Sequence, residues 1–92
     1  MSRLWVVVYD ITDNRNRLAV HRILDNHGNR VQHSVFECWL NDHVMTNLRK
    51  HLSRFIEKED SLRWYPLCRR CQQNIDWWGE GEAAEDPQFY LI

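Results

Sequence analysis

An aspartate followed by two arginines is the first group of residues whose types and spacing could support chemistry. Asp10 ends an apolar, valine-rich run, and Arg15 and Arg17 follow it closely. A buried strand that carries a carboxylate to its C-terminal end places charge where folds commonly bind ligands. The two arginines invite an anionic partner. The alternative is a surface loop in which Asp10 caps a turn.

A second candidate is the pair Cys68 and Cys71, which has the Cys-x-x-Cys spacing of half a zinc site. A tetrahedral site needs four ligands, and the sequence has no second Cys-x-x-Cys and no His-x-x-x-His pair after this one. Two half-sites could be completed across a dimer; otherwise the two residues are free thiols near a turn. Three cysteines in total do not make the disulfide framework of a secreted protein.

Composition and charge indicate one small globular domain. The 92 residues are 43% hydrophobic and 27% charged, and a chain of this length has a marginal core, which favours dimerisation. The net charge of −1 conceals an asymmetry. Residues 1–58 carry nine Lys/Arg against six Asp/Glu, whereas residues 59–92 carry three Arg against seven Asp/Glu. The basic part could therefore bind phosphates.

The sequence also bears on location. Its longest apolar run is too short to cross a bilayer, and the N-terminus lacks the basic-then-apolar layout of a signal peptide. We therefore expect a cytoplasmic protein with no membrane partner.

Hydrophobic periodicity predicts the elements that position Asp10 and the arginines. Residues 3–10 form a strand, and a helix runs from Asn14, its N-cap, to about residue 27. Gly28 is predicted to end that helix as a left-handed C-cap. The next extended segment, residues 30–40, alternates irregularly, which predicts a bulge or kink near Ser34 and Val35.

The rest of the chain is predicted from the same patterns. In order, it contains a helix over 42–57 capped by Asn41 or Asp42, a strand over 61–68 whose Pro66 lies at an edge or bulge, a loop over 69–73 and a short strand over 74–78. Residues 80–87 have the acidic composition of a linker. The apolar segment 88–92 is expected to add as a strand to the edge of its own sheet or a neighbour's.

This order of elements predicts a two-layer α+β sandwich formed by residues 1–79, with residues 80–92 as linker and C-terminal strand. If residues 30–40 bend into a hairpin, the arrangement becomes the ferredoxin-like βαββαβ fold. Periodicity alone does not decide between a hairpin and one bent strand.

Four motifs resemble those of one family in order, spacing and total chain length. They are Tyr9-Asp10-Ile11-Thr12-Asp13, Arg15-x-Arg17, Gly28-x-Arg30-Val31-Gln32-x-Ser34-Val35-Phe36-Glu37 and Tyr65-Pro66-Leu67-Cys68. The chain resembles the small CRISPR-associated protein (the "Cas two" family) that accompanies the integrase in spacer acquisition. The resemblance implies a ferredoxin-like homodimer with exchanged C-terminal strands, and Mg²⁺ or Mn²⁺ held between the two copies of Asp10.

The resemblance also implies a function and its residues. Asp10 would be both the catalytic and the metal-binding residue of an endonuclease acting on single-stranded RNA or double-stranded DNA. The sequence itself assigns no histidine as a general base, and His33, in the middle of an expected strand, is the nearest candidate. The residues expected to bind nucleic acid are Arg15, Arg17 and Arg30, and those expected to support the site are Tyr9, Ser34 and Phe36.

Three alternatives stay open at this level. In some family members the dimer is a non-cleaving scaffold that holds DNA between two integrase dimers. A virulence-associated toxin endoribonuclease would have a similar fold, although the Arg-Val-Gln-x-Ser-Val-Phe run favours the spacer-acquisition protein. The third alternative is a ligand-free regulatory module or an RNA-recognition module, and the latter would show paired aromatic strand motifs of the Lys/Arg-Gly-Phe kind, which the sequence lacks.

Overall fold

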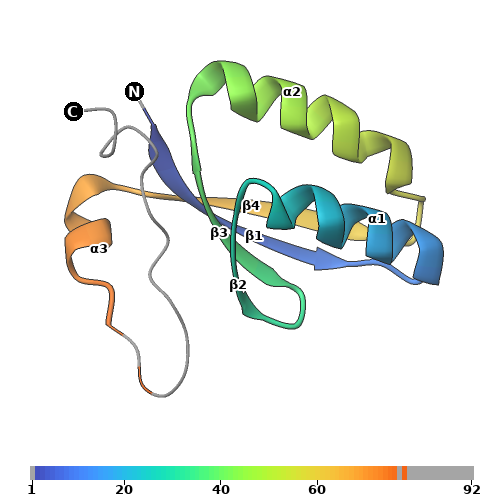
Figure 1. The fold of residues 1–92 in the computed structure, drawn as a ribbon, viewed down its shortest axis with the longest axis horizontal. Helices are drawn as coiled ribbons and strands as arrows, with labels where there is room; N and C mark the ends of the chain where they lie inside the picture. Colours follow the sequence, from blue (N-terminus) through green and yellow to red (C-terminus); the bar gives the residue numbers. More distant parts are fainter. Residues whose placement is uncertain (1, 77, 79–92) are drawn as a thin grey trace.

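The computed structural model describes residues 2–76 and residue 78, which form a four-stranded antiparallel sheet packed against two longer helices (Figure 1). In chain order the elements are β1 (Arg3–Asp10), α1 (Asn14–Asp25), β2 (Gly28–Gln32), β3 (Val35–Leu40), α2 (Asp42–Leu52), the 3₁₀ helix η1 (Ser53–Phe55), β4 (Ser61–Leu67) and α3 (Arg69–Gln73). The strand order is β2-β3-β1-β4. The predicted ferredoxin-like βαββαβ sandwich is therefore confirmed through β4.

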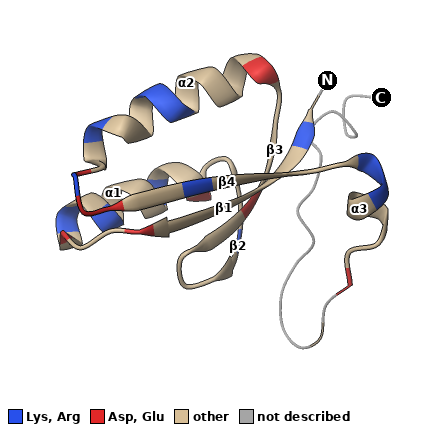
Figure 2. Cartoon of the chain, turned by 180° about the vertical axis from the view of Figure 1, so that it is seen from behind, with Lys and Arg blue, Asp and Glu red and all other residues tan. Residues whose placement is uncertain are grey.

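The central strand β1 explains why one face of the sheet is covered. Its Val7 and Tyr9 are buried in the core that the helices share, whereas Val6 and Val8 are only half-buried. This alternation places successive side chains on opposite faces of the strand. The helices contribute the apolar stripe that closes the core, formed by Val20 and Leu24 of α1 and Met45, Leu48 and Leu52 of α2. In Figure 2, β1 and β4 lie in front of α1.

The segment after α1 is a hairpin rather than one bent strand. Residues 33 and 34 form the turn between β2 and β3, which confirms the predicted kink near Ser34 and Val35, and a separate bulge lies between Arg30 and Gln32. A bulge in β2 leaves Val31 without a directly opposed residue on β3.

Gly28 does not end α1 as a left-handed C-cap; that prediction was wrong. The helix is capped by Asn26 in a right-handed conformation, and Gly28 is the first residue of β2. A Cβ atom at Gly28 would lie 2.1 Å from the Glu37 carbonyl oxygen and 2.7 Å from the Cys38 sulfur. Glycine is needed here because β3 passes directly over this position.

The helix starts were predicted to within one residue. The N-cap of α1 is Asp13 rather than Asn14, and its carboxylate accepts the Asn16 N–H at 2.9 Å. The N-cap of α2 is Asn41, one of the two predicted candidates. This helix ends at Leu52 and continues as η1, so it is shorter than the predicted 42–57.

The region after β4 departs most from the predictions. Pro66 does lie in an edge strand, because β4 pairs only with β1 among the described residues. Residues 69–73 form the short helix α3 rather than a loop, and residues 74–76 are not a strand. The predicted linker 80–87, the strand 88–92 and the boundary after residue 79 lie outside the described residues. None of the helices in the described part of the chain is long and apolar enough to span a membrane.

Candidate functional site

Asp10 is the last residue of β1 and is exposed. It pairs with Ser61 of β4, while the pairing of β1 with β3 ends at Val8 opposite Val35. Because Tyr9 points into the core, alternation along the strand directs Asp10 to the face of the sheet that the helices leave open. The carboxylate is thus presented to solvent at the end of the central strand.

The loop that follows Asp10 is held by hydrogen bonds between its backbone and side chains of other segments. The Asp60 carboxylate accepts the Thr12 N–H at 3.1 Å through one oxygen and the Glu57 N–H at 2.9 Å through the other. Asp60 therefore ties the β1–α1 loop to the segment between η1 and β4. Sequence reasoning missed Asp60; its only signal was a carboxylate in the turn just before a predicted strand.

Arg17 has a structural role in the same loop. Its guanidinium donates to the Ile11 carbonyl oxygen at 3.2 Å and to the Asn14 side-chain oxygen at 2.5 Å. It remains exposed, so its charge is still available to an anion. Arg15 is exposed on the first turn of α1, next to this loop.

Tyr9 and Phe36, two of the residues expected to support the site, lie side by side in the core. Their rings stack with centroids 6.3 Å apart, and the Tyr9 N–H donates to the Ser34 carbonyl oxygen at 3.0 Å. The Tyr9 hydroxyl donates to the His33 carbonyl oxygen and lies the same distance, 3.4 Å, from Nδ1 of His21. The structure thus joins the end of β1 to the β2–β3 turn.

His21 belongs to this cluster, and sequence reasoning missed it. Its ring packs edge-on against Phe36 with centroids 5.3 Å apart. The signal was present, because His21 follows Arg17 by four residues and so lies on the same face of α1.

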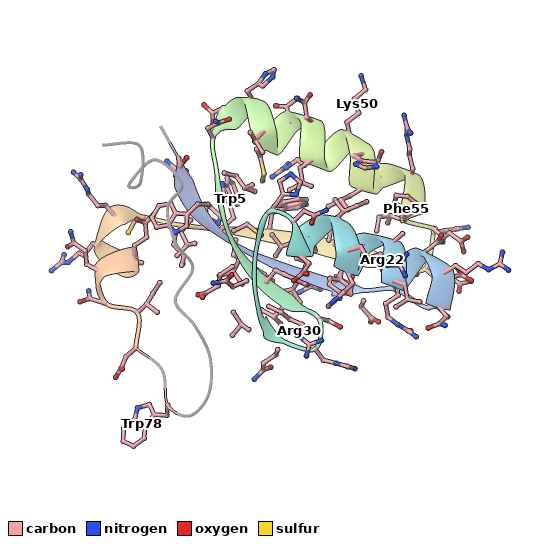
Figure 3. The ribbon with its side chains drawn as sticks, in the orientation of Figure 1. Trp5, Arg22, Arg30, Lys50, Phe55 and Trp78 are labelled. Carbon is pink, nitrogen blue, oxygen red and sulfur yellow. The ribbon has the colours of Figure 1, made fainter. Side chains whose placement is uncertain are left out.

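The charges of two arginines affect the pKa of Tyr9. Burial raises the pKa of the Tyr9 hydroxyl, and the positive charges of Arg30 and Arg17 partly oppose that rise. Arg30 is exposed on β2 opposite Phe36, and Figure 3 shows it on the β2–β3 hairpin. The fold therefore brings Arg17 and Arg30 from separate elements toward the Tyr9 hydroxyl, whereas Asp10 is directed to the opposite face of the sheet.

His33 was predicted to lie within a strand and to be the nearest candidate for a general base. It lies in the β2–β3 turn instead and is exposed there. What links it to the cluster is its carbonyl oxygen, which accepts from Tyr9. Nothing in this geometry gives its imidazole a role in proton transfer at Asp10.

The donor set around Asp10 is sparse. Within residues 2–76 and 78, no three His, Cys, Asp or Glu residues are grouped closely enough to hold a metal ion. A hard cation such as Mg²⁺ prefers six oxygen ligands and commonly takes several from water and phosphate. The exposed Asp10 carboxylate suits such an ion as one ligand, so a site here has to be completed by another molecule.

The fold and this site define a small ferredoxin-like protein with one exposed carboxylate at the end of its central strand and exposed arginines on the helix that follows that strand. The chain matches the family model described as CRISPR associated protein Cas2 over residues 2–75, and it belongs to that family.

Known relatives agree with the assignment. The chain is 41% identical to CRISPR-associated endoribonuclease Cas2 3 of Synechocystis over 90 residues, covering 97% of this chain and 98% of that protein. It is 41% identical to CRISPR-associated endonuclease Cas2 2 of Thermus thermophilus over 67 residues, 72% of this chain and 74% of that protein. The crystal structure of a hypothetical protein, TT1823, from Thermus thermophilus superposes with a TM-score of 0.79 at 35% identity, covering 92% of this chain and all of that one.

Proposed function

We propose that this Cas2 protein acts in spacer acquisition as a homodimer that binds nucleic acid and cleaves phosphodiester bonds with a divalent metal held by its two Asp10 carboxylates. The observation that carries the proposal is the exposed Asp10 at the end of β1, on the open face of the sheet. The names of the relatives, endoribonuclease and endonuclease, support nuclease activity as the chemistry. Family membership favours this function over a virulence-associated toxin or an RNA-recognition module.

The open face of the sheet supports the dimer. Val6 and Val8 are half-buried there, and Val6 lies between Glu37 of β3 and Tyr65 of β4. Burial already raises the pKa of the Glu37 carboxyl in one chain. A two-fold dimer brings the same patch of each copy together. Covering this face with a second copy would remove the valines from water and bring the two Asp10 residues toward each other.

The metal step follows from the ligand set. Two Asp10 carboxylates, phosphate oxygens and waters would complete the six ligands of Mg²⁺ or Mn²⁺. Such an ion neutralises charge on the phosphodiester and lowers the pKa of a bound water. The chain's own contribution is to hold Asp10 on a fixed strand end and to bind the flanking phosphates with Arg15, Arg17 and Arg30. A CRISPR-associated integrase dimer is the expected protein partner, and DNA or RNA the ligand.

The direct test measures cleavage of labelled single-stranded RNA and of duplex DNA, each in the presence of Mg²⁺ and in the presence of a chelator. Asp10→Asn should abolish metal-dependent cleavage of whichever substrate is cut. Asp25→Asn is the matched control, because Asp25 is an exposed aspartate at the far end of α1. Equal residual cleavage by wild type and Asp10→Asn would identify a contaminating nuclease and refute the catalytic role.

Thermal melting tests the metal site without reference to activity. Two facing carboxylates repel, so bound metal should raise the melting temperature of the wild type. At a free metal concentration of 100 times the dissociation constant, the free energy of unfolding should increase by about 2.7 kcal/mol. Asp10→Asn should lose that rise and be equally or more stable in chelator, whereas Asp25→Asn should keep the rise. If Asp10 only caps a turn, metal should change neither protein, and that result would contradict a metal site in the free dimer.

Strand exchange is tested by truncation after Gly79. Removal of residues 80–92 should shift the protein toward monomer or aggregate in analytical ultracentrifugation, because the apolar segment 88–92 is expected to pair with the partner's sheet. An unchanged dimer would show that the sheet faces alone hold the two copies together.

A non-cleaving DNA scaffold is the second candidate function. The sparse donor set around Asp10 favours it, since no group of three metal-ligating residues occurs in the described part of one chain. Binding of duplex DNA and integrase without any metal-dependent cleavage would support the scaffold over the nuclease.

A further inference from the structure

Cys68 and Cys71 lie side by side at a place that the candidate site does not use. Their sulfur atoms are 3.2 Å apart, and both residues are exposed around the first turn of α3. Leu67, just before them, pairs with Leu4, whereas Asp10 pairs with Ser61 at the other end of the same two strands. Six strand residues at about 3.3 Å each separate the two ends by roughly 20 Å. Figure 1 shows α3 at the end of the sheet away from the start of α1.

The two thiols have unequal surroundings. Cys68 is the N-cap of α3, and its sulfur accepts the Cys71 N–H at 3.4 Å. This bond and the contact with the Cys71 thiol lower the pKa of Cys68, and the same contact raises the pKa of Cys71. The two residues between them, Arg69 and Arg70, add positive charge at the start of the helix (Figure 2). Thiolates form readily in exposed sites of this kind, with positive charge and N–H donors nearby.

The third cysteine provides an internal contrast. Cys38 is fully buried in the core, and burial together with the neighbouring Glu37 raises its pKa to about 12. A buried thiol without a neighbouring thiol is unreactive toward soluble oxidants. The chain therefore contains one unreactive cysteine in its core and a pair of adjacent, exposed cysteines.

From the adjacency, exposure and unequal hydrogen bonding of these two residues, we propose that Cys68 and Cys71 form a redox-active dithiol that low-molecular-weight disulfides oxidise reversibly. The Cys68 thiolate attacks one sulfur of the small disulfide, forming a mixed disulfide and releasing one small thiolate. The Cys71 thiolate then attacks the Cys68 sulfur, closing the protein disulfide and releasing the second small thiolate. Two protein thiols are oxidised, and one small disulfide is reduced to two thiols.

Oxidation acts where the chain leaves the sheet. Cys68 directly follows β4, and the Gln72 side-chain amide of α3 donates to the Leu67 carbonyl oxygen at 2.9 Å. A disulfide replaces the reversible sulfur cap of α3 with a covalent link. Oxidation therefore adds a covalent constraint across the first turn of α3, directly after β4.

The test uses the full-length chain in glutathione buffers of graded potential, followed by acid quenching, alkylation and intact mass measurement. We expect one transition in which the protein loses two hydrogens, reverses with reductant and leaves Cys38 unreacted until the protein is unfolded. Peptide mapping should place the link between Cys68 and Cys71. If fully oxidising buffer produces no such link in folded protein, the proposal is wrong.

Two serine variants separate the roles of the thiols. Cys71→Ser should stop at a mixed disulfide on Cys68, because the resolving thiol is missing. Cys68→Ser should react about tenfold more slowly than Cys71→Ser at pH 7, because the bond from the backbone N–H of residue 71 to the Cys68 sulfur is kept in Cys71→Ser and still lowers the pKa of that thiol. Equal rates for the two variants, with circular dichroism matching the wild type, would overturn the assignment of Cys68 as the attacking residue. Protein that carries bound zinc and resists oxidation until it is chelated would overturn the dithiol role itself. Neither result bears on the nuclease proposal, since Asp10 lies at the other end of the sheet.

Discussion

Replacing Asp60 should loosen the loop that follows Asp10, because one carboxylate holds two backbone segments together. Its two oxygens accept the Thr12 N–H and the Glu57 N–H at 3.1 and 2.9 Å. Asp60→Ala removes both acceptors, and Asp60→Asn keeps one oxygen of the two. The series Asp, Asn, Ala therefore removes the hydrogen bonds one at a time.

The expected size follows from the exposure of these groups. A hydrogen bond to a charged group contributes about 1.5–3 kcal/mol when protected, but both of these bonds are at the surface, where water competes. We therefore expect Asp60→Ala to lower the free energy of unfolding by about 1–2 kcal/mol, and Asp60→Asn by roughly half as much. For a domain of this size 1 kcal/mol lowers the melting temperature by about 4–8 °C.

The assay is urea denaturation at one fixed protein concentration, since dimerisation contributes to apparent stability. Hydrogen exchange at the Thr12 and Glu57 amides locates the effect, and both should exchange faster in Asp60→Ala. Glu59→Ala is the matched control, removing an exposed neighbouring carboxylate from the same turn. If Asp60→Ala unfolds like the control and leaves both amides unchanged, this reasoning about the loop is refuted.

Further predictions follow from other contacts. Gly28→Ala should destabilise the protein by at least about 1–3 kcal/mol in urea denaturation, because a Cβ there meets the β3 backbone; wild-type stability would contradict that contact. Arg15→Ala should reduce the log–log salt slope of duplex binding by about 0.9 and leave the free energy of unfolding unchanged. Arg17→Ala should reduce the salt slope and also lower the free energy of unfolding, because Arg17 donates to the Ile11 carbonyl oxygen. A change in sequence preference with an unchanged slope would contradict phosphate binding. Tyr9 has a raised pKa in the folded state, so stability should fall as pH rises above about 10, and Tyr9→Phe should flatten that alkaline decline in denaturation measured against pH.

Local patterns were enough to predict β1 and the helix starts. The valine-rich run ending at Asp10 has the composition of a central strand, and Asn41 has the side chain of an N-cap. The stripe of Met45, Leu48 and Leu52 was recognisable because helical spacing alone places these side chains on one face. These features depend on residues that are close in the sequence.

The sequence-based reading failed where distant segments decide the conformation. Gly28 looks like a helix terminator, but its real constraint is the backbone of Glu37 and Cys38 on the next strand. Residues 69–73 look like a loop, yet the Cys68 cap and the bond from Gln72 to Leu67 make a short helix. Periodicity carries no information about such contacts, because it describes one segment at a time.

The same division holds for the site. The sequence alone determined that a carboxylate ends an apolar strand and that arginines follow it, since both are matters of residue type and order. Only the tertiary structure decided that Tyr9 stacks on Phe36, that Arg30 joins Arg17 near one buried tyrosine, and that Asp60 holds the loop. The physical reason is that a functional site depends on distances between side chains, and the packing of the sheet against its helices sets those distances.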